Sequence, residues 1–464
     1  MITARQVAAD VLARSRARAG FVAELVDDAF DTGGLRPPLG GADRRFVTQL
    51  VYGVMRRRAT LDALIEPFLH KPLHALQDRV LDVLHLGAFQ LAFLTHVPKH
   101  AAVHESVELA EHVGSPQAKG FLNGVLRRVS ELITDQFTLR PGPDALPFEP
   151  HASPVTAVTG RYRKLNAPIF PDASADPIGY LSAAHSWPWW LAERWFNRFG
   201  LEECVRLGFH FNAAPPLWIR TNKLNVDREA YRLQLAASAI DCEPGEHPQS
   251  LRLVDSPGVR DLPGYEAGDF CVQDHSSMLV AAAAGTAALP GMRVLDLCSA
   301  PGGKTSHLAE LMDNRGAIIA CDIEPRRLDT VATLCRRLGI RIVTPHLIQE
   351  NAEPPAGPFD AALVDAPCSN TGVLGRRPEV RWRIKPTEFQ HLIRLQTKLL
   401  FQAIERVKPR GTIVYSTCSI EPEENEGVVK GVLRAMKHVK LEAERYAIPG
   451  RPSDGGYWAR LRKS

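Results

Sequence analysis

The sequence lacks three features that would each indicate a class of protein. No apolar run reaches the roughly 18 residues of a membrane span, and the arginine-bearing start has no long apolar core of a secretion signal. The eight cysteines include no C-x-x-C pair, so neither a disulfide framework nor a zinc site is indicated. The excess of positive over negative charge is also small, because 56 Lys and Arg against 52 Asp and Glu leave a net charge of only +4. We therefore expect a cytoplasmic protein with reduced thiols and no metal or membrane partner, and any nucleic-acid contact has to come from local clusters of basic residues.

A phosphate-binding P-loop is nearly present but lacks its first glycine. Residues 296–311 read DLCSAPGGKTSHLAEL, which ends its turn on Gly-Gly-Lys-Thr as a P-loop does. Five positions before Gly303, however, stands Cys298, whose side chain would narrow the cradle, and Pro301 removes an N–H donor. The turn therefore predicts another ligand. An ATPase that uses the apolar AALVDA segment as its Walker B strand is the alternative.

The chain is long enough for two or three domains, and its patterns divide it into four regions. Apolar residues recur at helical spacing over 1–135, which predicts an all-α domain. Over 136–180 prolines are too dense for either regular element, so we expect a linker or an ordered insertion. Residues 181–285 predict a small α/β subdomain. Residues 286–464 alternate strand and helix, which predicts a mostly parallel sheet covered on both faces.

The first turn of the predicted parallel sheet has the spacing of a nucleoside site. Asp322 lies 19 residues beyond Gly303, at the end of the next predicted strand, and an acid about 20 residues on holds a ribose hydroxyl pair in such sheets. Without a full phosphate cradle, a nucleoside without pyrophosphate is favoured, and S-adenosylmethionine is the commonest such cofactor in this architecture. An ordinary tight turn with Asp322 at a solvated strand end is the plainer interpretation.

Two cysteines follow two predicted strands of this sheet. Cys368 comes just after ALVDA together with Asp365, and Cys418 follows IVYST, so both should face the crevice of the proposed cofactor. Most single cysteines are small buried hydrophobes, but polar strand-end loops are places where a thiolate can be exposed and activated. Cys271, Cys321 and Cys335 are expected to be structural.

Six segments resemble known families. DLCSAPGGKTSHLAEL, DAPCSNTGVLGRRPEVRW and YSTCSIEPEENEGVV together resemble the RNA cytosine-5 methyltransferases. RRFVTQLVYGVMRRRATLDALI, AAVHESVELAEHVG and KGFLNGVLRRV resemble the antitermination factor NusB. A NusB-like domain fused to such a catalytic domain is the arrangement of a family of bacterial small-subunit ribosomal RNA methyltransferases. The implied fold is an all-α NusB-like domain, a small α/β RNA-binding subdomain and a Rossmann-like class I methyltransferase domain.

The resemblance implies methylation of carbon 5 of a cytidine in 16S ribosomal RNA, with S-adenosylmethionine as the methyl donor and a covalent cysteine–cytosine adduct. Cys418 would be the nucleophile, Cys368 would assist release, and Asp365 would contact the base and help orient the cofactor methyl group. The implied cofactor-binding residues are Cys298, Ser299, Ala300, Pro301, Gly302, Gly303, Lys304, Asp322, Arg327 and Asp365. Transfer RNA or another RNA as substrate remains an alternative, as does a non-catalytic RNA-binding assembly factor. A pre-ribosomal particle and naked RNA are both open as substrate forms.

The sequence departs from the family pattern at two places. The aspartate that usually follows the third strand to hold the adenine is missing, and Glu350 or Asn351 could replace it. Asn370 stands where the family commonly has a small residue, which puts only the packing of the base in doubt.

Basic residues gather in a few short stretches that could contact RNA phosphates. These are Arg56, Arg57 and Arg58; Arg127 and Arg128; Arg376, Arg377, Arg381 and Arg383 around Trp382; and Arg220 with Asn222 in the small subdomain. Any of these stretches could instead be a solvated face, but GRRPEVRWR is favoured for RNA contact because it directly follows the Cys368 loop. A target base inside a helix would have to be turned out of its stack.

Overall fold

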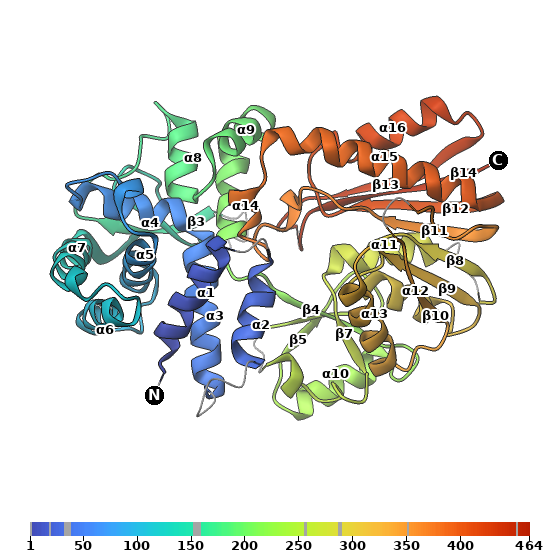
Figure 1. The fold of residues 1–464 in the computed structure, drawn as a ribbon, viewed down its shortest axis with the longest axis horizontal. Helices are drawn as coiled ribbons and strands as arrows, with labels where there is room; N and C mark the ends of the chain where they lie inside the picture. The colour runs from blue at the N-terminus through green and yellow to red at the C-terminus, as the bar shows by residue number, and fades with distance from the viewer. Residues whose placement is uncertain are drawn as a thin grey trace. The chain divides into compact units, whose positions relative to one another are not determined.

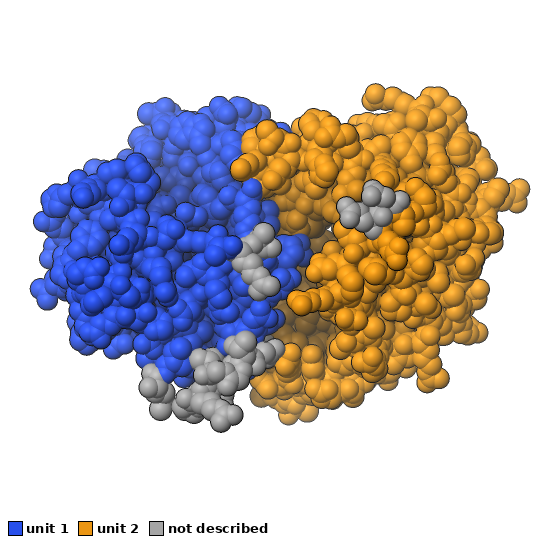
Figure 2. Space-filling model, viewed as in Figure 1, with its two compact units in different colours: residues 1–215, 374–383 blue, residues 216–373, 384–464 orange. Residues whose placement is uncertain are grey.

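The computed structural model describes residues 2–17, 20–31, 39–151, 159–254, 258–285, 290–349, 352–451 and 453–464. The chain divides into two compact units, which Figure 2 colours separately. Unit 1 comprises residues 1–215 and 374–383, and unit 2 comprises residues 216–373 and 384–464.

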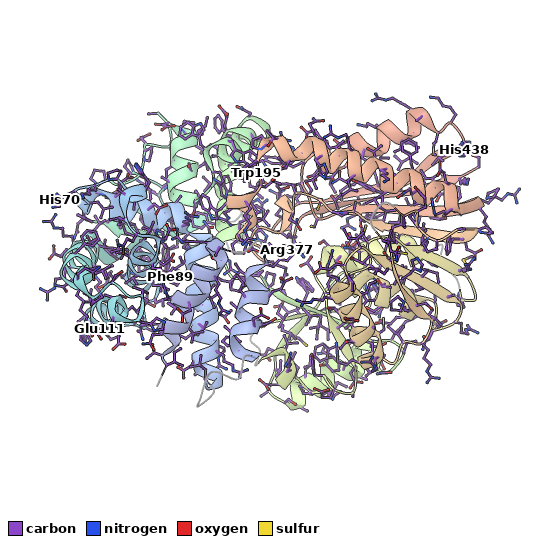
Figure 3. The ribbon with its side chains drawn as sticks, viewed as in Figure 1. His70, Phe89, Glu111, Trp195, Arg377 and His438 are labelled. Atoms are coloured by element: carbon purple, nitrogen blue, oxygen red, sulfur yellow. The ribbon has the colours of Figure 1, made fainter. Side chains whose placement is uncertain are left out.

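Unit 1 begins with helices that pack around a central one. The helices are α1 (Ala4–Ala17), α2 (Val22–Asp31), α3 (Gly41–Arg56), α4 (Arg58–Ile65), α5 (Asp78–Phe93), α6 (Lys99–His112) and α7 (Lys119–Leu132), with short 3-10 turns at Glu66–Phe68, Leu73–Ala75 and Pro116–Ala118. Every residue of α5 from Val80 to Ala92 is buried, because α1, α6 and α7 pack against it (Figure 1). Gly53 of α3 lies against the ring of Phe89, where a larger residue would overlap the ring; Figure 3 labels Phe89. This confirms the predicted helical N-terminal fold.

The proline-rich stretch forms strands, so the prediction that it contains no regular element is wrong. Strands β1 (Ile133–Thr138), β2 (Ala145–His151) and β3 (Thr159–Leu165) make an antiparallel sheet in the order β1-β3-β2. Pro147 is tolerated because β2 is an edge strand, where a missing N–H need not meet a neighbour. Of the two expected alternatives, the structure agrees with an ordered insertion.

Three further helices complete unit 1. They are α8 (Pro177–His185), α9 (Trp189–Asn212) and α14 (Val380–Arg383). Trp187 and Trp195 are fully buried with ring centroids 4.9 Å apart, as expected for core aromatics; Figure 3 labels Trp195. Trp189, by contrast, is 54% exposed.

Two arginines of the basic stretches lie in the interior of unit 1, so their predicted role in RNA contact is wrong. Arg57 donates to the carbonyls of Pro147 and Phe148, 2.9 Å each, and thereby fastens β2 to the helices. Arg381 is fully buried and donates to the carbonyl oxygens of Arg56, Ser186, Phe211 and Leu374 and to Oδ1 of Asn212. Burial lowers the pKa of both guanidinium groups to about 9. Arg127 and Arg128 of α7 are exposed.

Unit 2 opens with a small antiparallel sheet. Strands β4 (Leu217–Thr221), β5 (Cys242–Pro244), β6 (Ser250–Leu253) and β7 (Phe270–Val272) pair in the order β5-β6-β4-β7, with helix α10 (Arg228–Ala237) and a 3-10 turn at Val259–Asp261. Helix α10 begins where the side chain of Asp227 accepts a hydrogen bond from the backbone N–H of Ala230. Tyr231 and Leu235 of α10 pack on the apolar face of this sheet.

The rest of unit 2 is a seven-stranded sheet in the order β10-β9-β8-β11-β12-β14-β13 (Figure 1). Its strands are β8 (Arg293–Asp296), β9 (Ala317–Asp322), β10 (Val343–Leu347), β11 (Phe359–Asp365), β12 (Val407–Thr417), β13 (Val439–Ala447) and β14 (Gly456–Lys463). Its helices are α11 (His275–Gly285), α12 (Gly303–Leu311), α13 (Pro325–Arg337), α15 (Phe389–Arg406) and α16 (Glu426–Ala435), with 3-10 turns at Thr371–Val373 and Pro386–Glu388. The strands from β10 to β12 are parallel, as predicted, and β14 and β13 add an antiparallel edge that the sequence did not predict.

The central strands of this sheet are buried on both faces, because alternate residues of a strand point to opposite sides and each side meets a core. On β11, Val364 faces a cluster that includes Leu400 of α15, whereas Leu363 faces a cluster with Leu308 of α12 and Val331 of α13. A core on each side fixes the register of the central strands and hence the positions of the loops that follow them.

A buried ion pair joins the small sheet to helix α12. Arg220 of β4 donates to both carboxylate oxygens of Glu310, at 2.6 and 3.2 Å, and to the carbonyl of Gly303, at 2.9 Å. Neither charged side chain is exposed. Asn222 is buried as well and donates to the carbonyls of Gly268 and Leu338. The expected RNA contact by Arg220 and Asn222 is therefore wrong, because both side chains support the fold of unit 2.

Replacing Arg220 by methionine should destabilise unit 2 strongly. The substitution leaves the Glu310 carboxylate buried without a cation, and breaking a buried pair on one side costs about 3 kcal/mol or more. We expect a loss of that size in the free energy of unfolding, measured by urea denaturation. The matched control is Arg252→Met, which breaks the exposed pair with Glu243 and should cost less than about 1 kcal/mol. Equal losses in the two variants would contradict this account.

Candidate functional site

The predicted site residues gather where the strand order of the large sheet reverses. From β8 the chain moves outward to β9 and β10 and then returns to β11 on the other side of β8. Ligands of such sheets bind beyond the carboxyl ends of the strands at this point. Asp296 ends β8, and Asp365 ends β11.

The turn after β8 is held tightly to its neighbours. Gly302 has a φ of 102°, and a Cβ there would lie 3.2 Å from the Cα of Val331, so only glycine fits without displacement. Ser299 donates to the carbonyl of Cys321 from its backbone N–H, 2.9 Å, and from its hydroxyl, 3.0 Å. Thr305 donates to Asp296 at 2.7 Å. The turn from Cys298 to Lys304 is therefore fixed to both β8 and β9, and Gly303 begins helix α12.

A buried carboxylate lies at the end of the neighbouring strand. The Asp322 side chain is 3% exposed, and its Oδ2 lies 3.4 Å from Nη1 of Arg327. Arg327 also donates to the carbonyl of Ala300, 3.1 Å, which connects it to the glycine turn. The two acceptor oxygens of Asp322 at this strand end suit the hydroxyl pair of a ribose, which can donate to them. Glu350 and Asn351, expected near the adenine, lie outside the described residues.

An ion pair joins the turn to β11. Nζ of Lys304 lies 2.6 Å from Oδ2 of Asp365, and the Ser416 hydroxyl donates to Oδ1 of Asp365 at 2.8 Å. Burial alone would lower the pKa of Lys304, but the charge and hydrogen bond of Asp365 raise it above its ordinary value. Lys304 is thus a fixed cation beside the strand ends.

The two predicted thiols meet directly. Sγ of Cys368 lies 3.3 Å from Sγ of Cys418, and the hydrogen bond with Cys418, together with burial, raises the pKa of Cys368 well above its ordinary value. The Cys418 thiol donates to Oδ1 of Asn370 at 3.1 Å, while Nδ2 of Asn370 donates to the carbonyl of Cys368 at 2.8 Å. The structure therefore brings Cys368 and Cys418 together in one site with thiols in contact.

Sequence reasoning gave too little weight to Asn370 and assigned no role to Glu424. Asn370 adopts a φ of 57°, a left-handed conformation that asparagine tolerates better than most residues, and so its amide reaches both cysteines. Glu424 is fully buried behind the cysteine loops. The signal for Glu424 was its place in the EPEENE segment, which begins three residues after Cys418.

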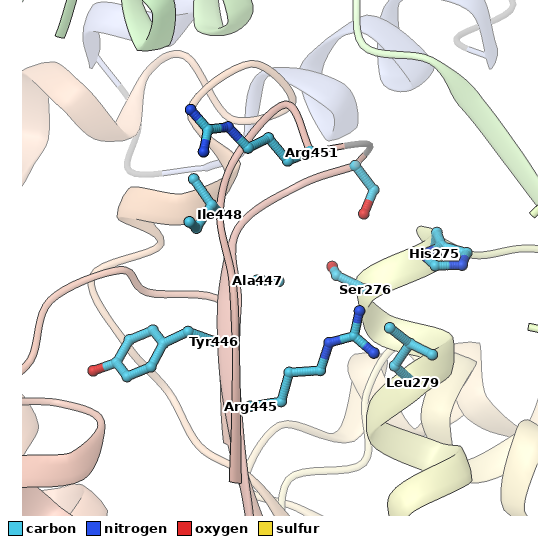
Figure 4. Close-up of a pocket in the computed structure, with 9 residues that line it drawn as sticks. His275, Ser276, Leu279, Arg445, Tyr446, Ala447, Ile448 and Arg451 are labelled. Carbon is cyan, nitrogen blue, oxygen red and sulfur yellow. The ribbon is translucent and has the colours of Figure 1, made fainter. Parts of the chain in front are cut away.

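A cavity lies elsewhere in unit 2, between α11 and the end of β13 (Figure 4). It has a volume of about 140 Å³, and Arg445, Tyr446 and Ser276 are among its lining residues. Arg445 is paired in bidentate fashion with Glu246, 3.0 Å for each bond. None of the predicted site residues lines this cavity. The candidate site at the strand ends is therefore supported by the chemistry of its residues and not by the presence of this cavity.

The described part of the chain lacks two kinds of feature. No cluster of three or more His, Cys, Asp or Glu side chains there could hold a metal ion. No helix among the described residues is long and apolar enough to cross a membrane.

Comparison with family models divides the chain into three parts. Residues 287–451 match the model described as 16S rRNA methyltransferase RsmB/F, residues 2–131 match the NusB family, and residues 187–260 match a ferredoxin-like domain of RsmF/B-like methyltransferases. The strand order and the match over residues 287–451 identify unit 2 as containing a Rossmann-like class I methyltransferase domain.

Individual proteins are similar over nearly the whole chain. A protein of Synechocystis sp., named as probable ribosomal RNA small subunit methyltransferase B, is 35% identical over 97% of this chain and 93% of its own length. A protein of the same name from Bacillus subtilis is 30% identical over 85% of this chain and 81% of its own length. The solved structure of a methyltransferase homolog protein from Pyrococcus horikoshii is 27% identical, with a TM-score of 0.53, over 60% of this chain and 96% of that chain. The chain therefore belongs to the RsmB/F family of methyltransferases.

The carboxyl group of Asp296 should make stability depend on pH. Burial raises its pKa from 3.8 to about 7, so between these values the folded protein holds a proton that the unfolded chain has lost. This contribution to stability therefore falls as pH rises from about 4 to about 7. Asn at this position cannot ionise, so the stability of Asp296→Asn relative to wild type should rise across that window and stay constant above it. Urea denaturation at a series of pH values measures the difference, and a difference independent of pH would refute this expectation.

Proposed function

We propose that this methyltransferase modifies carbon 5 of a cytidine in small-subunit ribosomal RNA through a covalent cysteine–cytosine adduct. The observation that carries the proposal is the contact between the Cys368 and Cys418 thiols, 3.3 Å apart, at the strand ends beside Asp365. Methylation of an oxygen or an exocyclic nitrogen needs no thiol nucleophile, whereas carbon 5 of cytosine does. The names of the relatives from Synechocystis sp. and Bacillus subtilis support ribosomal RNA of the small subunit as the substrate.

Cys418 is the proposed nucleophile. Addition of its thiolate to carbon 6 makes the cytosine ring enamine-like, so carbon 5 can attack an electrophilic methyl group. Loss of the carbon-5 proton and of the thiolate then restores the aromatic ring. Cys368, whose thiol contacts that of Cys418, is proposed to assist release. Its raised pKa keeps it a protonated thiol, which gives its proton to the departing Cys418 thiolate and, as a thiolate, then accepts the carbon-5 proton.

Asp365 is proposed to bind the target base. Its carboxylate is held by Lys304 and by Ser416, so it is oriented before the base arrives. When the Cys418 thiol adds to carbon 6, its proton passes to ring nitrogen 3, so that the new N–H and the exocyclic amine can both donate to this carboxylate. These hydrogen bonds stabilise the adduct, because a fixed acceptor needs no reorganisation during the reaction. Lys304 limits the negative potential of the site in the absence of the base.

S-adenosylmethionine is the proposed cofactor and supplies the methyl group when bound. Residues 298–304 would line its methionine part, and Asp322 would hold the ribose with Arg327 nearby. The alternative of an ATPase is disfavoured because Cys298 and Pro301 occupy the positions where a P-loop needs glycine and an N–H donor.

Exchange of each site cysteine should separate the two proposed roles. Cys418→Ala should transfer no labelled methyl from S-adenosylmethionine to unmodified small-subunit RNA and form no denaturation-resistant protein–RNA complex. Cys368→Ala should accumulate that complex, because its addition step is intact and its release step is slowed. The control is Cys242→Ala, a half-buried thiol of β5, which should retain full activity. The opposite pattern for the two site cysteines would reverse their assignment, and label outside 5-methylcytidine would sink the proposal.

Removal of the charge at Asp322 should weaken cofactor binding. A hydrogen bond to a charged group contributes about 1.5 kcal/mol or more, so Asp322→Asn should raise the Kd of S-adenosylmethionine by about tenfold or more in calorimetry. Glu324→Gln is the matched control, because this exposed neighbour carries the same charge outside the buried site. Tight binding of ATP without any binding of S-adenosylmethionine would favour the ATPase alternative instead.

A further inference from the structure

Glu424 is a buried carboxylate that contacts both cysteine loops. Its Oε1 accepts the backbone N–H of Ser369, 2.9 Å, and its Oε2 accepts the hydroxyl of Ser419, 2.5 Å, and that of Ser369. Ser369 is the residue after Cys368, and Ser419 is the residue after Cys418. One side chain thus joins the neighbours of the two thiols.

A third element reaches the same carboxylate. Nε2 of Gln396, on helix α15, donates to Oε1 of Glu424 at 2.9 Å and to the carbonyl of Pro367 at 2.9 Å. Pro367 precedes Cys368, so this loop is held on both sides of its cysteine. Tyr415 of β12 also donates to the backbone carbonyl of Glu424, at 2.5 Å, which fixes the position of Glu424 itself.

The bonds to Glu424 belong to a closed set of hydroxyl contacts. Ser369 and Ser419 lie 3.0 Å apart between their hydroxyl oxygens, and Thr371 lies 3.3 and 3.2 Å from them. These hydroxyls are buried, so an acceptor for their protons has to come from the protein, and Glu424 provides it. Without it, several donors would be left unsatisfied in the interior.

We propose that Glu424 is a positioning residue that sets the distance between the Cys368 and Cys418 thiols. This inference rests on the proposed function for its catalytic consequence, although the geometric claim does not depend on it. Glu424 acts on the positions of the two sulfurs through Ser369 and Ser419, which follow the two cysteines in the chain. This positioning depends on whether the side chain is long enough to hydrogen-bond both cysteine loops, and less on its negative charge.

Three substitutions of Glu424 distinguish the effect of its side-chain length from the effect of its negative charge. Glutamine keeps an oxygen for the Ser369 N–H and Gln396, and its amide can donate to the Ser369 and Ser419 hydroxyls, whose own protons then go to one another and to Thr371. Glu424→Gln should therefore retain the loop geometry. Aspartate keeps the charge but is shorter by one methylene and cannot reach both loops. Alanine removes every contact. The control is Glu423→Ala, because Glu423 is the exposed neighbour in the same loop.

The test is the rate at which a short bifunctional thiol reagent joins Cys368 to Cys418 in the full chain without RNA or cofactor. Cys368→Ala and Cys418→Ala give the background. We expect Glu424→Gln and Glu423→Ala to crosslink nearly as fast as wild type, and Glu424→Asp and Glu424→Ala several-fold more slowly. The two slow variants should also lose about 100-fold in kcat, as misplacement by about 1 Å can cost, with the Kd of S-adenosylmethionine unchanged.

The outcomes separate this inference from the proposed function. Wild-type crosslinking in a folded Glu424→Ala, or faster crosslinking in Glu424→Asp than in Glu424→Gln, would overturn the positioning role. If Glu424→Ala does not fold, the comparison of Asp with Gln decides. The predicted order of crosslinking rates, found together with a wild type that makes no 5-methylcytidine, would uphold the positioning of the thiols and reject the proposed reaction.

Discussion

The parallel pairing of β11 with β12 is the interaction on which the site depends. In its register Asp365 stands opposite Ser416, so the two strands end at the same level and their loops leave the sheet side by side. Cys368 is three residues beyond Asp365 and Cys418 is two beyond Ser416. Because a shift by one residue would turn every side chain of a strand to the other face, the two apolar cores that fix this register also fix the contact between the thiols.

The buried carboxyl groups around the site are stabilised in different ways. Lys304 neutralises Asp365, whereas Asp296 has a hydroxyl donor and a raised pKa instead of a cation. Glu424 is surrounded by hydroxyl and amide donors. These buried groups share hydrogen-bond partners, so each member of the network at the strand ends restricts the positions of the others.

Much of the fold could be predicted from the sequence, because helical spacing and strand–helix alternation are local patterns. The cysteine pair and Asp365 were predicted to share a crevice because parallel strands end at one edge of a sheet. The burial of Arg220 and Arg381 could not be predicted, because it depends on residues far away in the sequence. The sequence does not show which arginines are surrounded by backbone carbonyls or pair with a buried acid. The strands of the proline-rich stretch were missed because tolerance of proline depends on being at a sheet edge, which is a property of the assembled sheet.

The hydrogen bonds of Arg220 also limit where this chain can be divided into separate domains. The family models describe the ferredoxin-like part and the catalytic part as separate modules, with matches that end at residue 260 and begin at residue 287. Arg220, in the first module, donates to Gly303 and Glu310, in the second, beside the turn proposed for the cofactor. A catalytic module excised at the boundary of its match would therefore carry an unpaired acid on α12 into solvent. The two modules are therefore joined by a buried ion pair and should be kept together when the chain is divided.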